Sequence, residues 1–106
     1  MNRKVQRLRC THMHPGEILR EEFIEPFRMS AAELGRRIHV SSALVRGICN
    51  ERRAVTADTA IRLARFFGNS EQFWMNLQSG YDLRRAQAVA AKDVASIRPL
   101  KEQGAA

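Results

Sequence analysis

The sequence predicts an all-α domain built from five helices, and three observations lead to this prediction. Serine and threonine residues of the kind that cap helices precede most of the apolar runs, and apolar residues in these runs recur three or four positions apart. Runs that alternate apolar and polar residues, which would indicate strands, are nearly absent. A chain of 106 residues can bury one hydrophobic core and is too short for two.

The first helix is predicted within the stretch HPGEILREEFIEPF. Pro15 stands in its first turn, where proline is tolerated because its missing N–H would have no partner there. The apolar Ile18, Leu19 and Phe23 share one side, so we expect that side to face the core. We expect the helix to stop before Pro26, because proline disfavours a helical conformation in the residue that precedes it.

Serine caps predict the second and third helices. Ser30 followed by Glu33 forms a capping box, in which the hydroxyl and the carboxylate each accept from a backbone N–H that the helix leaves free. This places the second helix at about 31–38. Ser41 caps the third helix in the same manner and places it at about 42–49.

Two further helices follow. Thr56 caps the fourth, and Gly68 is placed to end it with a positive φ angle, while Ser70 begins a fifth helix that continues into the nineties. Helical spacing predicts the core sides of both: Ala60, Leu63, Ala64 and Phe67 on the fourth, and Phe73, Trp74, Leu77 and Tyr81 on the fifth. The aromatic residues here, with Phe66, are interpreted as core or dimer interface; the alternative is a platform for stacking single-stranded nucleic acid.

Charge divides the chain into blocks. Basic residues number 18 against 11 acidic residues, for a net charge of +7, and most of the basic residues are arginine. Residues 1–13 and 28–53 are basic, whereas 14–27 are acidic. A polyanion such as nucleic acid is therefore the leading partner. We divide the chain into a basic N-terminal segment, a domain at 14–87 and a C-terminal extension at 88–106.

Metal, redox and enzymatic chemistry are not indicated. Cys10 and Cys49 form no Cys-x-x-Cys pair, and His12 and His14 lack a third ligand at a recognisable spacing, so we predict no metal and no cofactor. Cys49 with His39 would need a cleft to act as a nucleophile pair, so no enzymatic activity is predicted. Because no apolar run reaches the roughly 18 residues of a membrane span and no secretory signal is recognisable, we expect a cytoplasmic, nucleoid-associated protein.

The second and third helices have the spacing of a helix-turn-helix unit. Glycine inside a helix costs about 1 kcal/mol relative to alanine, so Gly35 indicates that the next helix crosses close by. Val40, in the break, is placed to fill the gap between the two helices. Six residues at fixed offsets give the pattern: Leu34, Gly35, Ile38, Val40, Val45 and Ile48.

The outward side of the third helix carries small or polar residues, namely Ser42, Ala43, Arg46, Gly47 and Asn50. A helix with such a face fits the major groove of DNA, which is about 12 Å wide. Arg46 can donate two hydrogen bonds to guanine O6 and N7. The predicted phosphate contacts are Ser30, Asn50, Arg52 and Arg53. The alternative is a pair of helices that never touches DNA and whose arginines are merely solvated.

Three stretches give the chain a family resemblance: HPGEIL at 14–19, the helix-turn-helix at 31–50 and RLARFFGNSEQFWMNLQSGYDL at 62–83. With them, residues 13–86 resemble the HigA-type antitoxins, also called VapI-like, of the XRE or phage-repressor-like helix-turn-helix family. The third stretch is the most specific. The resemblance implies a lambda-repressor-like domain that dimerises, binds a palindromic operator in its own promoter and neutralises a RelE-like or HigB-like toxin that cleaves mRNA.

The resemblance also implies which residues read the operator. Base contacts come from the start and outward face of the third helix, here Ser41, Ser42, Ala43, Arg46 and Gly47. Family members often have larger polar residues in place of Ala43 and Gly47, so base recognition is expected to depend mainly on Arg46. The turn usually contains glycine or asparagine where this chain has His39, which adopts the left-handed conformation less readily than glycine.

Other partner surfaces are hypotheses. The acidic residues of the first helix would complement a basic RNA-cleaving toxin: Glu17, Glu21, Glu22 and Glu25. The alternative is a solvated acidic face that stabilises the start of a helix. Tyr81 and Leu83 are the candidate dimer interface, and the segment from Arg3 to Arg9 is either an arm on DNA or a disordered end. The alternative functions are a free-standing repressor without a toxin and a helical module that binds only protein.

Overall fold

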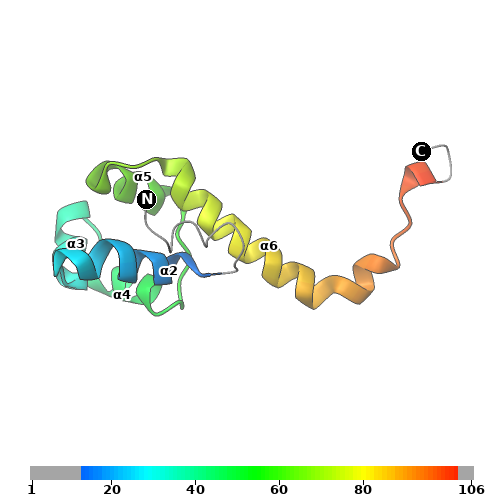
Figure 1. Cartoon of the computed structure of the whole chain (residues 1–106), viewed down its shortest axis with the longest axis horizontal. Helices are drawn as coiled ribbons and strands as arrows, with labels where there is room; N and C mark the ends of the chain where they lie inside the picture. The colour runs from blue at the N-terminus through cyan, green and yellow to red at the C-terminus, as the bar shows by residue number, and fades with distance from the viewer. Residues whose placement is uncertain (1–12, 103–106) are drawn as a thin grey trace.

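The computed structural model describes residues 13–102, in which helices pack together and no strand occurs (Figure 1). Five helices follow one another, the first of which changes type along its length. The bounds are α2 (Pro15–Ile18) continued by a π-helical turn η1 (Leu19–Ile24) and a 3₁₀ turn η2 (Glu25–Phe27), then α3 (Ala31–Ile38), α4 (Ser42–Cys49), α5 (Ala57–Phe67), α6 (Glu71–Ala95) and a final 3₁₀ turn η3 (Leu100–Glu102). The predicted all-α fold of five helices is confirmed.

The predicted caps begin four of these helices. The hydroxyls of Ser30, Ser41, Thr56 and Ser70 each accept a hydrogen bond from the backbone N–H three residues later, at 2.9 to 3.3 Å. Each hydroxyl thus satisfies one of the N–H groups that a helix start leaves without a partner. The carboxylate of Glu33, expected to complete the capping box, lies 3.8 Å from a guanidinium nitrogen of Arg37.

The chain around Pro26 differs from the prediction. The first helix was expected to stop before this proline, which was wrong, because helical turns continue to Phe27. The N–H of Glu25 donates to the carbonyl of Arg20, five residues earlier, which gives the wider π-helical turn. Pro26 then lies at the start of a 3₁₀ turn, where its missing N–H leaves no bond unmade. Arg28 ends the segment in the left-handed conformation, with φ 54°.

The core lies where α2, η1, α3, α4, α5 and the first part of α6 meet. Its buried side chains include Leu19, Leu34, Val45, Ile48, Val55, Leu63 and Trp74. Trp74 is fully buried, and its indole N–H donates to the side chain of Asn69 at 2.9 Å. The side-chain carbonyl of Gln78 accepts from the N–H of Val55 at 2.7 Å, which ties the segment after α4 to α6. Gln78 is therefore a structural residue that helical spacing of apolar residues did not indicate.

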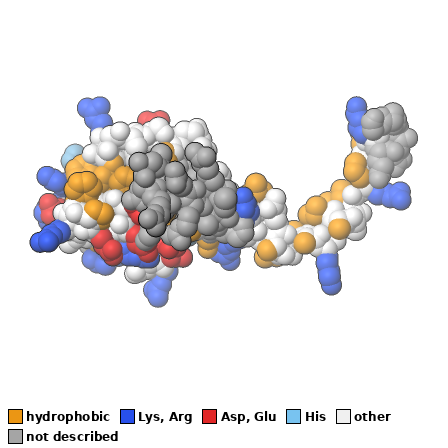
Figure 2. All heavy atoms as spheres, viewed as in Figure 1, with side chains coloured by type: hydrophobic (Ala, Val, Ile, Leu, Met, Phe, Trp, Pro, Cys, Tyr) orange, Lys and Arg blue, Asp and Glu red, His pale blue; other side chains and the backbone are white. Residues whose placement is uncertain are grey.

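α6 has two parts that differ in their surroundings. Its first part, up to Gln78, packs on α5 and α2, whereas its second part projects from the domain (Figure 1). Figure 2 shows hydrophobic side chains along the projecting part, and Leu83, Val89 and Val94 there are exposed. No helix within residues 13–102, α6 included, is both long and apolar enough to cross a membrane.

Candidate nucleic-acid interface

The turn between α3 and α4 depends on one left-handed residue and one glycine. His39 adopts φ 64° and ψ 45°, as expected from its place in the turn. The N–H of Val40 donates to the carbonyl of Gly35 at 2.8 Å. A Cβ on Gly35 would lie 2.7 Å from the carbonyl oxygen of Val40. The close approach that this glycine permits is therefore made by the backbone of the turn, immediately before α4, rather than by the body of that helix.

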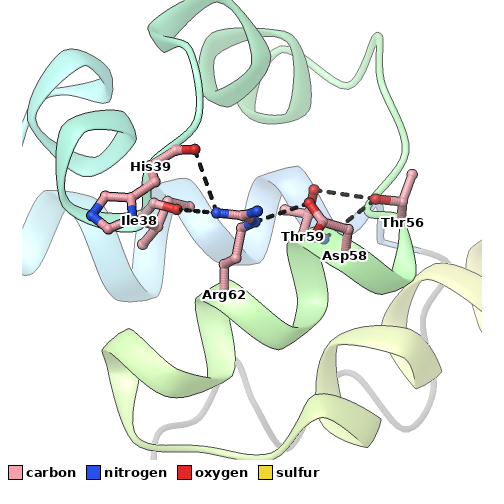
Figure 3. Close-up of polar contacts among 6 residues, drawn as sticks. All are labelled: Ile38, His39, Thr56, Asp58, Thr59 and Arg62. Carbon is pink, nitrogen blue, oxygen red and sulfur yellow. Dashed lines mark hydrogen bonds and ion pairs between the residues drawn. The ribbon is translucent and has the colours of Figure 1, made fainter.

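Arg62 of α5 binds the end of α3 (Figure 3). Its Nη1 donates to the carbonyl of Ile38 at 2.9 Å and to that of His39 at 3.4 Å, while its Nε donates to the carboxylate of Asp58 at 2.9 Å. Carbonyls at the end of a helix lack partners within the helix, and a guanidinium can supply them. Asp58 and Arg62 stand four residues apart on α5, so they lie on the same face of the helix and can pair. The contact of Arg62 with α3 joins segments that are far apart in the sequence.

α4 is held from its inner side by the start of the domain. Val45 and Ile48, the predicted inner face, are 2% and 1% exposed. A Cβ on Gly16 would lie 1.7 Å from the carbonyl oxygen of Ile48, so only glycine lets α2 come this close. The guanidinium of Arg20 donates to the carbonyl of Cys49 at 2.5 Å. These contacts fix the end of α4, and the sequence did not indicate them because their partners are far apart in the chain.

The outward face of α4 carries most of the residues predicted to contact bases. Ala43, Arg46 and Asn50 are exposed and Ser42 is half-buried. Ser41 is exposed, and its hydroxyl oxygen accepts the capping hydrogen bond, so the hydroxyl hydrogen can still donate to DNA. The structure thus brings these residues together at the start and along one side of a helix whose other side is buried.

The end of α4 turns the chain back through a Schellman motif. Glu51 adopts φ 64°, its N–H donates to the carbonyl of Ile48 at 2.9 Å, and the N–H of Arg52 donates to that of Gly47 at 2.8 Å. Glycine is the usual residue at this left-handed position, so Glu51 holds a conformation that is costly for its residue type. Arg52 and Arg53 follow directly and are exposed, beside the predicted DNA-binding face.

Gly47 does not lie open on the outward face, as the sequence led us to expect. It is half-buried, because the side chain of Arg53 lies over it. A Cβ on Gly47 would lie 2.5 Å from Cδ and 2.8 Å from Cγ of Arg53. The residue predicted to contact bases is therefore covered by one of the residues predicted to contact phosphates.

His14 caps the start of α2. Its Nδ1 accepts a hydrogen bond from the N–H of Gly16 at 2.8 Å, and its ring meets the ring of Tyr81 edge-on, with centroids 4.8 Å apart. Burial lowers the pKa of His14, an effect that the carboxylates of Glu51 and Asp82 oppose. The neutral ring is also the form that can accept through Nδ1. His14 thus joins the start of α2 to the middle of α6.

The other residues considered for metal or nucleophilic chemistry are placed as follows. Cys49 is half-buried, and burial raises the pKa of its thiol. A thiol that stays protonated is a poor nucleophile. Within residues 13–102, no group of three or more histidine, cysteine or acidic residues is placed to hold a metal ion. His12 and the segment from Arg3 to Arg9 lie outside the described residues.

Known proteins share this arrangement. The helix-turn-helix family matches residues 20–74, about half of the chain. An antitoxin HigA of Pseudomonas aeruginosa, whose structure was solved with the higBA promoter, is 49% identical and superposes with a TM-score of 0.82, over 85% of this chain and 99% of that one. The chain belongs to the HigA-type helix-turn-helix family. The resemblance that its sequence motifs indicated is confirmed.

Two curated relatives agree with this family. Virulence-associated protein I of Dichelobacter nodosus is 49% identical over 75 residues, which are 71% of this chain and 69% of that protein. Antitoxin HigA-1 of Vibrio cholerae is 32% identical over 85 residues, 80% of each chain. The chain spans 61% to 64% of the length of several uncharacterised helix-turn-helix regulators that it also matches. HigA-type proteins are antitoxins and transcriptional regulators, so the chain belongs to a family without enzymatic activity.

Four acidic residues of this HigA-type chain lie on one segment, formed by α2, η1 and the start of η2. Figure 2 shows acidic side chains gathered over this region. The residues are Glu17, Glu21 and Glu22, which are half-buried, and Glu25, which is exposed. The carboxylate of Glu21 lies 3.5 Å from the guanidinium of Arg20. The four residues predicted as a toxin-binding surface are thus neighbours in the fold.

Proposed function

We propose that this chain is an antitoxin that represses its own operon by binding operator DNA as a dimer and neutralises a HigB-like, mRNA-cleaving toxin. The observation that most supports DNA binding is the division of α4 into a buried and an exposed side. A helix held rigidly along its inner side, with small and hydrogen-bonding groups outside, can enter the major groove without rearrangement. The related HigA of Pseudomonas aeruginosa was solved with promoter DNA.

The residues take separate roles on the DNA. Arg46 is placed to donate to a guanine, Ser42 can donate or accept, and Ala43 can contact a thymine methyl group. Phosphate contacts position the protein without reading sequence, and the exposed residues that suit them lie at the helix ends: Ser30, Asn50 and Arg52. The N-termini of α3 and α4 add backbone N–H groups that favour anions.

The toxin-binding half of the proposal rests on charge. A protein that cleaves mRNA must present a basic surface to its substrate. The four glutamates from Glu17 to Glu25 form an acidic surface on an otherwise basic chain, so they suit such a partner. Binding there would cover the RNA site of the toxin and would leave the outward face of α4 available to DNA.

Dimerisation is proposed through α6. Tyr81 is half-buried and Leu83 is 57% exposed, at the point where the helix leaves the domain. A second copy would cover this apolar surface and would place two recognition helices about 34 to 36 Å apart, as a palindromic operator requires. In this proposal residues 14–87 are the DNA-binding domain and 88–106 an extension, and the protein acts in the cytoplasm at the nucleoid.

Pull-down of the tagged chain from its native host at low salt tests both halves, with bound protein and bound DNA identified. Recovery of a small basic protein together with the promoter of the chain is the expected result. DNA without a protein partner would contradict the antitoxin half and would leave a free-standing repressor. A protein partner without DNA would contradict the DNA-binding half.

The dependence of binding on salt provides a second test. Each neutralised phosphate releases counterions, so log Kd should change with log salt by about 0.9 per phosphate. We expect the affinity for promoter DNA to fall steeply as salt rises. A flat response would indicate a surface that binds protein rather than DNA.

A further inference from the structure

Arg53 contacts α4 both through its backbone and through its side chain. Its backbone N–H donates to the carbonyl of Gly47 at 3.1 Å, beside the N–H of Arg52, which donates to the same oxygen. Its aliphatic stem occupies the space next to Cα of Gly47 where any larger residue would place a Cβ. A Cβ built on Gly47 would lie only 2.5 Å from Cδ of Arg53. The stem of Arg53 therefore lies against α4 at Gly47, although Arg53 follows the helix in sequence.

The surface under Arg53 is the one that faces DNA in the proposed function. Gly47 lies one turn after Ala43 and directly follows Arg46, both of which are exposed on the outward side. Alanine and glycine make this strip of the helix shallow. A helix that enters the groove along this strip brings the stem of Arg53 with it, and the guanidinium presents up to five donors in a planar fork.

We propose that Arg53 is a second specificity-determining residue, which reads base edges beside Arg46, and that Gly47 serves as its seat rather than as a base contact. This assignment rests on the proposed function. It exchanges the roles that the sequence alone suggested for Gly47 and Arg53. Gly47 has no side chain and so leaves room on the helix, and the stem of Arg53 fills that room. The N–H of Arg52 donates to the same carbonyl of Gly47, but the three atoms nearest the Cβ position of Gly47 all belong to the side chain of Arg53. Arg52 is therefore assigned to phosphate alone.

The test measures affinity for the promoter operator of the chain and for a set of operators with single base-pair substitutions. Arg53→Ala is expected to lower affinity for the native operator about 5- to 150-fold and to abolish the preference at one base pair in each half-site, as loss of a bidentate base contact does. Arg52→Ala is the matched control, which should weaken all operators alike. If Arg53→Ala also weakens all operators alike, the assignment to bases is overturned.

A substitution at the seat tests the mechanism. Gly47→Ala places a methyl group where the stem of Arg53 lies, and the flexible stem can move away while the helix gains propensity, so the chain should stay folded. We expect Gly47→Ala to lose the same base preference as Arg53→Ala, and the double variant to lose no more than either single variant. Additive losses would overturn the seat. Circular dichroism melting of each variant checks that folding is unchanged.

The two proposals fail in distinguishable ways. A wild-type chain that shows no preference for its promoter over unrelated DNA overturns the proposed function, and the role of Arg53 with it. A wild-type chain that prefers its promoter, with an Arg53→Ala variant that keeps every base preference, overturns only the role of Arg53.

Discussion

The inner side of α4 is buried in the core, whereas its outer side is exposed to solvent. On the inner side, Val45 and Ile48 are almost fully buried, and the backbone of α2 approaches so closely that Gly16 leaves no room for a side chain. On the outer side, Ala43 and Arg46 are exposed. Substitutions on the inner side should therefore change stability, whereas those on the outer side should change DNA binding alone.

The largest effect is expected where α2 meets α4. Gly16→Ala would place a Cβ 1.7 Å from a carbonyl oxygen of the buried helix end, so backbone must move. We expect it to lower the free energy of unfolding by more than about 4 kcal/mol, within reach of unfolding a domain of ordinary stability. Urea denaturation measures this loss. Gly80→Ala, where a Cβ would point into open space, is the control and should be neutral or stabilising.

A core truncation on the same side comes next. Ile48→Ala leaves a cavity beneath α4 and should lower the free energy of unfolding by about 2 to 5 kcal/mol, measured in the same way. At temperatures where the variant is still folded, its affinity for operator DNA should be close to that of the wild type. A large loss of affinity in a folded variant would show that the two sides of α4 are not independent.

The left-handed residues of the helix-turn-helix should respond to glycine. His39→Gly removes the steric cost of φ 64° and is expected to stabilise the chain by no more than about 1 kcal/mol, because glycine also gains entropy in the unfolded state. Thermal unfolding measures the gain. Arg36→Gly, three residues earlier and inside α3, should instead destabilise the chain by about 1 kcal/mol. Effects of the same sign at both positions would contradict this account.

The smallest effect concerns pH. Because burial lowers the pKa of His14, the folded chain takes up this proton less readily than the unfolded chain does. The stabilisation is complete above about pH 6.5, the value for an unperturbed histidine, and is lost as the pH falls toward the lower pKa of the folded state. His14→Asn keeps an N-cap without this titration, so its stability should depend less on pH in that range. If the stability of the wild type and that of the His14→Asn variant depended equally on pH, the assignment of this dependence to His14 would be contradicted.

The features that could be predicted from sequence are the local ones. A hydroxyl at Ser41 or Thr56 caps the helix that follows it whatever the rest of the chain does, so helix starts could be placed closely. Apolar spacing likewise separated the inner from the outer side of α4, since Val45 and Ile48 lie on one side of any helix drawn through them.

The remaining features depend on how distant segments approach each other. Gly16, Arg20 and Arg62 contact backbone carbonyls of other helices. No local sequence pattern indicates which carbonyl lies nearby. Gly47 was assigned to the DNA surface because its position on the helix is outward, but the chain reversal at Glu51 returns Arg53 over it. The sequence predicted that the first helix ends before Pro26, because the switch to π and 3₁₀ turns has no local sequence signal.

The most direct test of the central claim compares Arg46→Ala with Arg65→Ala in binding to the promoter DNA of the chain, by fluorescence anisotropy. Both arginines are exposed, but Arg65 lies on α5 rather than on α4. We predict that Arg46→Ala loses about 1 to 3 kcal/mol of binding free energy and relaxes one base preference, while its thermal unfolding stays unchanged. Equal losses for both variants, or no loss for Arg46→Ala, would contradict the claim that this face of α4 reads DNA.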